Sequence, residues 1–444
     1  MLFLSGTLGL YATDALSPGV VHVPPAPEAL LNTNLDADSG TKETAWEKSI
    51  ENAWVKMHDD YGIVPFVAYW GVFQANPTGG QTQSAAWFQL LQFGGQIEFE
   101  RYGCKGGSFY ASGSFASGHD LSESLGNVFT VSQSVVGMKG VGLNEVYFTQ
   151  VIGENDFLQF RLGRMAAGSS FATLPIEGLA VSGAAAGNPF SLYTNIPFES
   201  STGATWAAFV RVNPTPDTYA QVGVYQADPR ADVTDYHGLN VSLRPSNGVL
   251  SMVETGWTPT FGQTADTVSP DGKTKVPGLP GLPGVYEVGA YYSNAPFDSF
   301  VGDNQSNAYG FYLQAQQMVW RDPTVSALNL TLWGGMTCSP QDRISLLPVM
   351  GFGGVDLHGP IPGRRDDSVF LNGYLGHFST AYSSSLVAGG DAPATMEKVF
   401  DMGYVVQVSK NVQFQPDVQV ILQPRGTTGI PNAVVLGFQV SAIF

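Results

Sequence analysis

The stretch NVQFQPDVQVILQPRGTTGIPNAVVLGFQVSAIF, residues 411–444, has the pattern of two strands joined by a turn. Counting back in twos from Phe444, one face is wholly apolar and carries Ala442, Val440, Phe438, Leu436 and Val434. The opposite face mixes small, polar and apolar residues. Side chains alternate across a strand, so this hairpin separates an apolar medium from a wetter one. The pattern favours the closing strands of a membrane β-barrel, with Phe438, Val440 and Phe444 toward lipid, although a soluble sandwich could also end this way.

The composition supports the barrel. Of 444 residues, 13% are charged, against about 25% in typical soluble domains. No run approaches the ~18 apolar residues of a membrane helix. Low charge without a hydropathy peak is expected where polarity alternates residue by residue across a barrel wall.

The formal net charge of −17 argues against a nucleic-acid partner, because phosphates require a basic face. It fits either acidic solubilising loops or a lumen that favours cations and neutral solutes over anions. Cys104 and Cys338 lie far apart, with no ligand spacing around them. We therefore predict no metal and no cofactor, and the cysteines are either two small apolar residues or one disulfide.

The chain divides into three parts. Residues 1–15 resemble a truncated export signal without its positively charged start, and residues 16–60 form a leader. Within the leader we predict an amphipathic helix over 42–59, capped by Thr41 or Thr44. Its apolar face carries Trp46, Ile50, Trp54 and Met57. This helix either covers part of a barrel opening or is a plain leader helix, and residues 61–444 are expected to form one barrel.

From Ile63 onward, about seventeen alternating runs are separated by turn residues. Two of these predicted strands cover 237–244 and 369–382. We predict an all-β fold, a transmembrane antiparallel β-barrel of about 16 strands, which leaves an aqueous channel. In FLQFRLGR (157–164), Arg161 alternates with leucines and phenylalanine. An arginine on the lipid face costs roughly 2–4 kcal/mol at the midplane, so Arg161 should face the lumen.

Two connections are too long for hairpin turns and are expected to fold inward as constriction loops. They cover about 116–140, which contains His119 and Asp120, and about 165–203. A third, 258–284, has the composition of a surface loop. The residues predicted to line the channel and its constriction are His119, Asp120, Glu145, Tyr147, Gln159, Arg161 and Arg211.

Enzyme chemistry is not predicted. Asp120 with Glu145, or Asp366 with Asp367, could be imagined as a glycosidase pair. The second pair is weakened because adjacent residues on one strand face opposite ways. No catalytic triad spacing, HExxH motif or phosphate loop is present. We interpret Arg364, Arg365, Asp366 and Asp367 as a solvated or wall-bracing salt-bridge cluster rather than as solute ligands. Rings that could stack on sugars are Tyr147, Trp206, Tyr225 and Trp333, with Trp206 alternatively at the lipid interface.

Several segments together resemble the carbohydrate-selective porins of the OprB type. They include YGIVPFVAYWGVFQANPTGG (61–80), LGRMAAGSSFATLP (162–175), GPIPGRRDDSVFLNGYLGHFS (359–379) and the C-terminal hairpin. The resemblance implies a sixteen-stranded barrel of the bacterial outer membrane with weak monosaccharide sites near in-folded loops. The loop matches are 108–135 and 165–200, and the departure at FASGHDLSE (115–123) puts glucose specificity in doubt more than the barrel.

These observations predict a porin for passive diffusion of small neutral solutes, with carbohydrates such as monosaccharides expected. The alternatives are a closed structural or adhesive barrel of the same membrane and a secreted all-β glycosidase. The expected partners are the solutes, outer-membrane lipid and the barrel-assembly machinery, which would recognise the C-terminal strand. Both a monomer and a homotrimer remain open.

Overall fold

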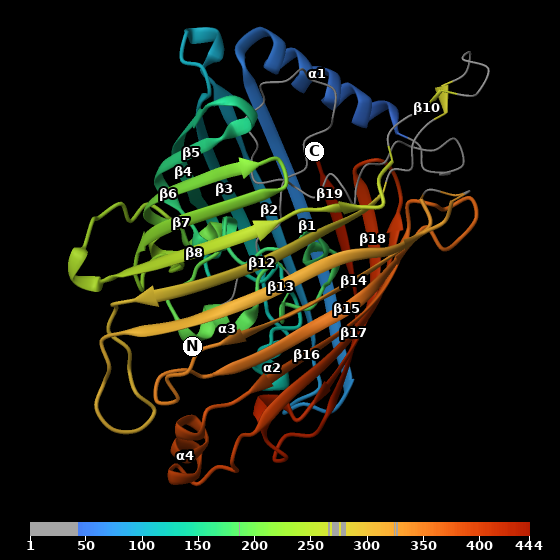
Figure 1. Ribbon diagram of the computed structural model, residues 1–444. Coiled ribbons are helices and arrows are strands. Elements are labelled where there is room, and N and C mark those ends of the chain that lie inside the picture. Colours follow the sequence, from blue (N-terminus) through green and yellow to red (C-terminus); the bar gives the residue numbers. More distant parts are fainter. Residues whose placement is uncertain are drawn as a thin grey trace.

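The computed structural model describes residues 43–444, except 186, 265–266, 269–274, 277–280, 324 and 326. The predicted export signal and most of the predicted leader lie outside these residues. Within them, sixteen long antiparallel strands close into a barrel, as predicted (Figure 1). The first eight are β1 (Ile63–Thr78), β2 (Ala85–Glu98), β3 (Gly107–Gly118), β4 (Gly140–Ile152), β5 (Leu158–Met165), β6 (Thr205–Thr215), β7 (Thr218–Gln226) and β8 (Val249–Trp257).

The second eight strands continue around the wall. They are β12 (Leu282–Ser293), β13 (Ala308–Arg321), β14 (Asn329–Cys338), β15 (Val349–His358), β16 (Ser368–His377), β17 (Met396–Gln407), β18 (Val412–Leu422) and β19 (Ala433–Ile443). The short β9 (Thr260–Phe261) pairs with β12, and β10 (Thr267–Val268) pairs with β11 (Lys275–Val276). Of the predicted surface loop 258–284, residues 265–266, 269–274 and 277–280 lie outside the described residues.

The barrel closes where β1 pairs with β19, and Phe73 lies opposite Phe438 at this seam. Their rings are 5.7 Å apart between centroids on the outer face. Alternation holds elsewhere too, because Leu332 is exposed outward while the flanking Thr331 and Trp333 are buried inside. The wall is therefore one β-layer thick, apolar outside and largely polar inside.

The two ends of the barrel differ. Short turns such as 216–217 and 408–411 join strands at the end where the C-terminus and helix α1 (Ala45–Tyr61) lie. The opposite end carries the long connections 119–139, 166–204 and 227–248. Outer-membrane barrels have short periplasmic turns and long extracellular loops, so the end with α1 is the periplasmic one.

Helix α1 begins with a capping box at Thr44, one of the two predicted caps. Its Trp46 and Trp54 rings pack on Phe444 at centroid distances of 5.2 and 6.4 Å. The described part of the chain has three further α-helices, α2 (Ser122–Leu125), α3 (Phe190–Asn195) and α4 (Thr380–Ala388). No helix among the described residues has the length and apolarity needed to cross a membrane.

The structure corrects two predicted strands and decides between the two alternatives for the cysteines. The predicted strand 237–244 is wrong, since this segment forms no ladder and belongs to the connection between β7 and β8. The predicted strand run 369–382 ends early, at His377, because Ser379 caps α4. Cys104 and Cys338 are both free, at opposite ends of the barrel, so they form no disulfide.

Candidate functional site

Two long connections fold into the barrel. Residues 119–139 carry α2, and residues 166–204 carry α3 (Figure 1). Leu125 of α2 and Phe190 of α3 are almost completely buried. The interior of a sixteen-strand barrel is too wide for wall side chains alone to fill, so these loops supply the narrowing.

The two in-folded loops are hydrogen-bonded to each other through their backbones. The Gln133 N–H donates to the Val181 carbonyl at 2.8 Å, and the Gly183 N–H donates to the Thr130 carbonyl at 2.8 Å. A buried backbone donor or acceptor without a partner costs about 1–3 kcal/mol. This pairing therefore makes the two loops one folded unit.

Wall amides hold the first loop in place. The Val131 carbonyl accepts hydrogen bonds from the side-chain amides of Gln74 on β1, at 2.7 Å, and Gln419 on β18, at 2.8 Å. The carboxylate of Glu397 on β17 accepts the N–H of Phe129 at 2.8 Å. These residues face inward because they alternate with outward apolar residues along each strand.

The second loop is attached to the opposite side of the wall. Glu254 on β8 accepts the Ala172 N–H at 2.8 Å, and Gln316 on β13 accepts the Ile176 N–H at 2.9 Å. Both loops are thus fixed by polar side chains of several strands, as a rigid constriction requires.

Cationic side chains gather on β5 and β6. Arg161 donates to Gln159 at 3.2 Å and lies 4.9 Å from the Phe209 ring centroid and 5.7 Å from that of Tyr147. Arg211 lies 3.8 Å from the Tyr219 ring centroid. Both arginines face the interior, where an arginine avoids the lipid cost described above.

Carboxylates lie on the strands next in order. The Tyr219 hydroxyl is within hydrogen-bond distance of Glu254, at 2.9 Å, and of Glu287 on β12, at 2.8 Å. Asp401 on β17 and Asp417 on β18 are also buried inside the wall. The inner wall therefore carries guanidinium groups at β5 and β6 and carboxyl groups at β8 and β12. Charged side chains that line a pore control its ion selectivity.

A cavity of about 880 Å³ opens at the extracellular end, where six connections and α4 meet. Aromatic rings on its wall include Phe297, Phe300 and Tyr382. Its charged residues are Asp120, Glu123, Asp298 and Arg425. Arg425 donates to the Tyr382 hydroxyl at 2.9 Å, and burial raises the pKa of Asp120 to about 6.

The structure places the predicted channel residues in two groups. His119 and Asp120 lie at the extracellular mouth. The wall residues are Glu145, Tyr147, Gln159, Arg161 and Arg211, on β4 to β6. Glu145 accepts the Ala166 N–H at 2.9 Å, where the second loop begins. Asp120 therefore lies at the mouth, whereas Glu145 holds the start of the second loop to the wall.

Other predicted residues lie away from the lumen. Arg364 and Asp367 form an ion pair of 2.6 Å in the periplasmic turn between β15 and β16. Arg365 donates to the Gly359 carbonyl at 2.6 Å, and Asp366 is half-buried beside them. Phe438 and Val440 take outward positions on β19, and Phe444 meets α1.

Sequence reasoning missed several interior residues. Glu254, Glu287 and Glu397 each occupy an inward position on a strand, and this alternation was the signal that could have found them. Of the predicted sugar-stacking rings, Trp206 faces outward, and Tyr147, Tyr225 and Trp333 are buried in hydrophobic clusters. The accessible rings are instead those of the extracellular cavity.

A closed sixteen-strand barrel narrowed by two inner loops defines a porin of the bacterial outer membrane. A family model described as carbohydrate-selective porin, OprB family, matches residues 82–444. The chain therefore belongs to the OprB family of carbohydrate-selective porins.

Two related proteins and one solved structure resemble this chain. Porin B of Pseudomonas aeruginosa is 25% identical over 322 residues, 65% of this chain and 65% of that protein, which is just under two thirds of its length. The putative porin QuiX of Acinetobacter baylyi is 25% identical over 327 residues, 66% of this chain and 67% of that one. The high-pH structure of Pseudomonas putida OprB covers 91% of this chain and 99% of its own, with a TM-score of 0.79 and 18% identity. At that identity the likeness shows the fold.

Proposed function

We propose that this porin lets small neutral solutes, carbohydrates such as monosaccharides among them, diffuse passively across the outer membrane, and that it performs no catalysis. The observation that carries the proposal is the extracellular cavity, which leads toward a polar interior narrowed by loops. Binding sites for small molecules combine apolar and aromatic surface with a few polar groups that fix orientation. The cavity has both.

The aromatic rings suit the C–H faces of a sugar ring. Phe300 and Tyr382 meet edge to face at a centroid distance of 5.2 Å, which holds both rings in fixed orientations. Arg425, next to Tyr382, offers donors for sugar hydroxyls. A neutral polyol can use both kinds of surface without carrying a charge into the channel.

The charges of the cavity favour neutral over anionic sugars. Three carboxyl groups, those of Asp120, Glu123 and Asp298, accompany one guanidinium, that of Arg425. Like charges disfavour entry of an anion. A sugar acid should therefore enter less readily than the neutral sugar of the same size.

The test is single-channel recording in planar lipid bilayers with the purified protein. Conductance steps should appear, and glucose should reduce the current in a saturable way, whereas gluconate at the same concentration should do so much less. If neither glucose nor another neutral monosaccharide reduces the current through the open channel, the protein is a channel that does not bind carbohydrates.

A closed structural or adhesive barrel is the second candidate, because buried side chains of both loops form a large hydrophobic cluster inside the wall. The same recordings separate the two functions. A complete absence of conductance steps from folded protein would favour the closed barrel.

A further inference from the structure

Residues 237–244, which we call the outer segment, run across the outside of the barrel wall. At its start, the His237 Nδ1 atom lies 2.8 Å from the Val141 carbonyl on β4. Further along, the Val241 carbonyl accepts the Trp206 indole N–H at 2.8 Å. Val141 and Trp206 both have outward, exposed side chains. His237 lies at the edge of β4, where its carbonyl also accepts the Leu143 N–H at 3.0 Å. From there the outer segment crosses the outer face of β5 and β6 near their extracellular ends.

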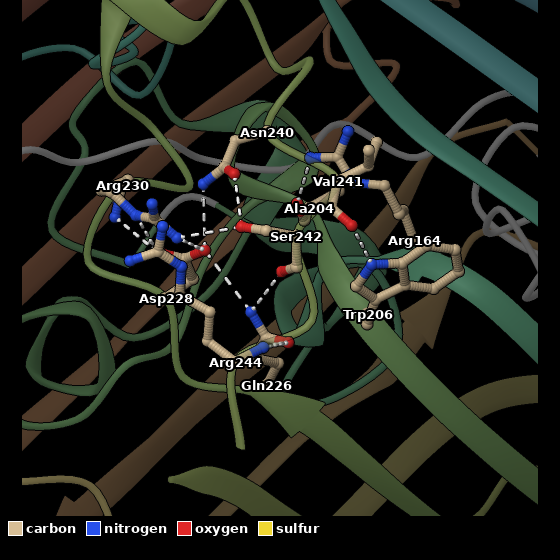
Figure 2. Close-up of polar contacts among 10 residues, drawn as sticks. All are labelled: Arg164, Ala204, Trp206, Gln226, Asp228, Arg230, Asn240, Val241, Ser242 and Arg244. Atoms are coloured by element: carbon tan, nitrogen blue, oxygen red, sulfur yellow. Dashed lines mark hydrogen bonds and ion pairs between the residues drawn. The ribbon is translucent and has the colours of Figure 1, made fainter. Parts of the chain in front are cut away.

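The outer segment covers an arginine that points out of the barrel. Arg164 has the same parity on β5 as the exposed Leu162, yet it is almost completely buried. Its guanidinium donates to the Gly238 carbonyl. It also donates to the Ala204 carbonyl at 2.7 Å (Figure 2). A bare arginine on the lipid face is costly, and the outer segment removes it from that face.

The side chains of the outer segment alternate although it forms no ladder. Leu239, Val241 and Leu243 are 65%, 56% and 69% exposed. Asn240 and Ser242, between them, turn toward the wall. The Asn240 amide donates to Asp228 at 3.1 Å, and the Ser242 hydroxyl donates to Asn240 at 2.7 Å.

The polar side chains of the outer segment are hydrogen-bonded to an ion pair between Asp228 and Arg230. Arg230 and Asp228 lie 2.9 Å apart. Arg230 also donates to the Ser242 hydroxyl at 3.3 Å, and the Gln226 amide donates to the Ser242 carbonyl at 3.2 Å (Figure 2). The polar side chains of Asn240 and Ser242 are thus bonded toward the wall while the aliphatic side chains point outward. A hydrogen-bonded polar side chain avoids the cost of an unpaired one in an apolar medium.

The apolar side chains of the outer segment continue the apolar outer face of the wall. Val141, Leu162, Trp206 and Val224 are exposed on β4 to β7 below and beside them. A stable contact between two copies buries ~800 Å² on each, more than three aliphatic side chains offer. Lipid chains need no such complementary surface. We propose that the outer segment lies in the outer leaflet, with Leu239, Val241 and Leu243 inserted among lipid acyl chains.

The test is spin labelling of the full-length protein in lipid vesicles, with Cys104 and Cys338 replaced by serine. A nitroxide is attached at Val241→Cys, and its collisions with oxygen, which concentrates in hydrocarbon, are compared with those of a neutral nickel chelate, which stays in water. Leu162→Cys is the hydrocarbon reference. Ser246→Cys, in the exposed stretch just after the outer segment, is the water reference.

The ratio of oxygen to nickel collisions at Val241→Cys should match that at Leu162→Cys and exceed that at Ser246→Cys by at least about tenfold. A ratio equal to that of Ser246→Cys would put the outer segment in water and overturn the proposal. Dipolar broadening between labels, with neither reagent reaching them, would show that a second copy covers the segment and would overturn it equally. Unchanged single-channel conductance in each labelled variant verifies the fold.

Discussion

The carboxylate of Glu397, on the inner face of β17, accepts the backbone N–H of Phe129 in the first in-folded loop at 2.8 Å. It also accepts the N–H of Val128 at 2.8 Å and that of Arg425 at 2.5 Å. One wall side chain therefore joins the constriction to the rim of the extracellular cavity.

We expect Glu397→Ala to loosen the first loop. Three backbone donors lose their acceptor, and each unsatisfied buried group costs about 1–3 kcal/mol. Open-channel current noise should rise and the free energy of unfolding in urea should fall. Glu397→Gln keeps one acceptor oxygen, so its current noise and its free energy of unfolding should lie between those of Glu397→Ala and of the unmodified protein. Ser441→Ala is the matched control, because its hydroxyl bonds to Gln413 within the wall. Noise equal to that of the unmodified protein would mean that Glu397 does not hold the loop.

Arg161→Ala should shift ion selectivity toward cations and raise conductance. Arg161 is an interior cation beside the loop residue Ser170, to which it donates at 3.3 Å. Its removal takes positive charge out of the interior. Reversal potential in a salt gradient measures the shift. Arg244→Ala, which removes an exposed arginine outside the lumen, should change neither quantity. If Arg161→Ala behaves like Arg244→Ala, then Arg161 does not line the constriction.

The barrel was predictable because apolar and polar residues alternate within each strand. Alternation in the C-terminal hairpin and around Arg161 shows the two faces without knowledge of any partner strand. The error at 237–244 has the same origin. Leu239, Val241 and Leu243 alternate with polar residues because the outer segment also separates apolar from polar surroundings, but it crosses the strand ends rather than joining the sheet.

The contacts of the site were not predictable in this way. Val128 and Glu397 are 269 positions apart in the sequence, and no local pattern pairs them. Loop length did predict that the connection at about 165–203 folds inward, because a long apolar connection must pack somewhere. The rings of the cavity come from separate connections, as Phe300 and Tyr382 illustrate, and only the closed barrel brings them together.

Glu47→Ala should detach α1 from the periplasmic rim. Glu47 is almost completely buried and accepts the Ser409 hydroxyl at 2.5 Å and the Asn411 N–H at 3.0 Å. These hydrogen bonds act against burial and leave the pKa of Glu47 lowered. Limited proteolysis should cut near α1 at least several-fold faster in this variant. Glu43→Ala, which removes a 3.5 Å contact with Lys410 and leaves the hydrogen bonds of Glu47 to Ser409 and Asn411 in place, should be cut at nearly the normal rate. Equal rates in both variants would assign the attachment to Trp46 and Trp54 instead.

Cation preference at the extracellular mouth should fall as pH falls through about 6. Burial raises the pKa of Asp120 to about 6, above the usual value for this side chain. The carboxyl is therefore charged at pH 8 and mostly neutral at pH 5, and acidification removes one negative charge from the cavity. Glu123 and Lys139 are the charged groups that act on Asp120, and Asp298 and Arg425 line the same cavity. Reversal potentials at pH 8 and pH 5 measure the change. Asp120→Asn should already show the low-pH selectivity at pH 8 and should lose most of the step near pH 6. If the change in reversal potential near pH 6 persists in Asp120→Asn, then another group titrates, because residue 120 is neutral at every pH in this variant.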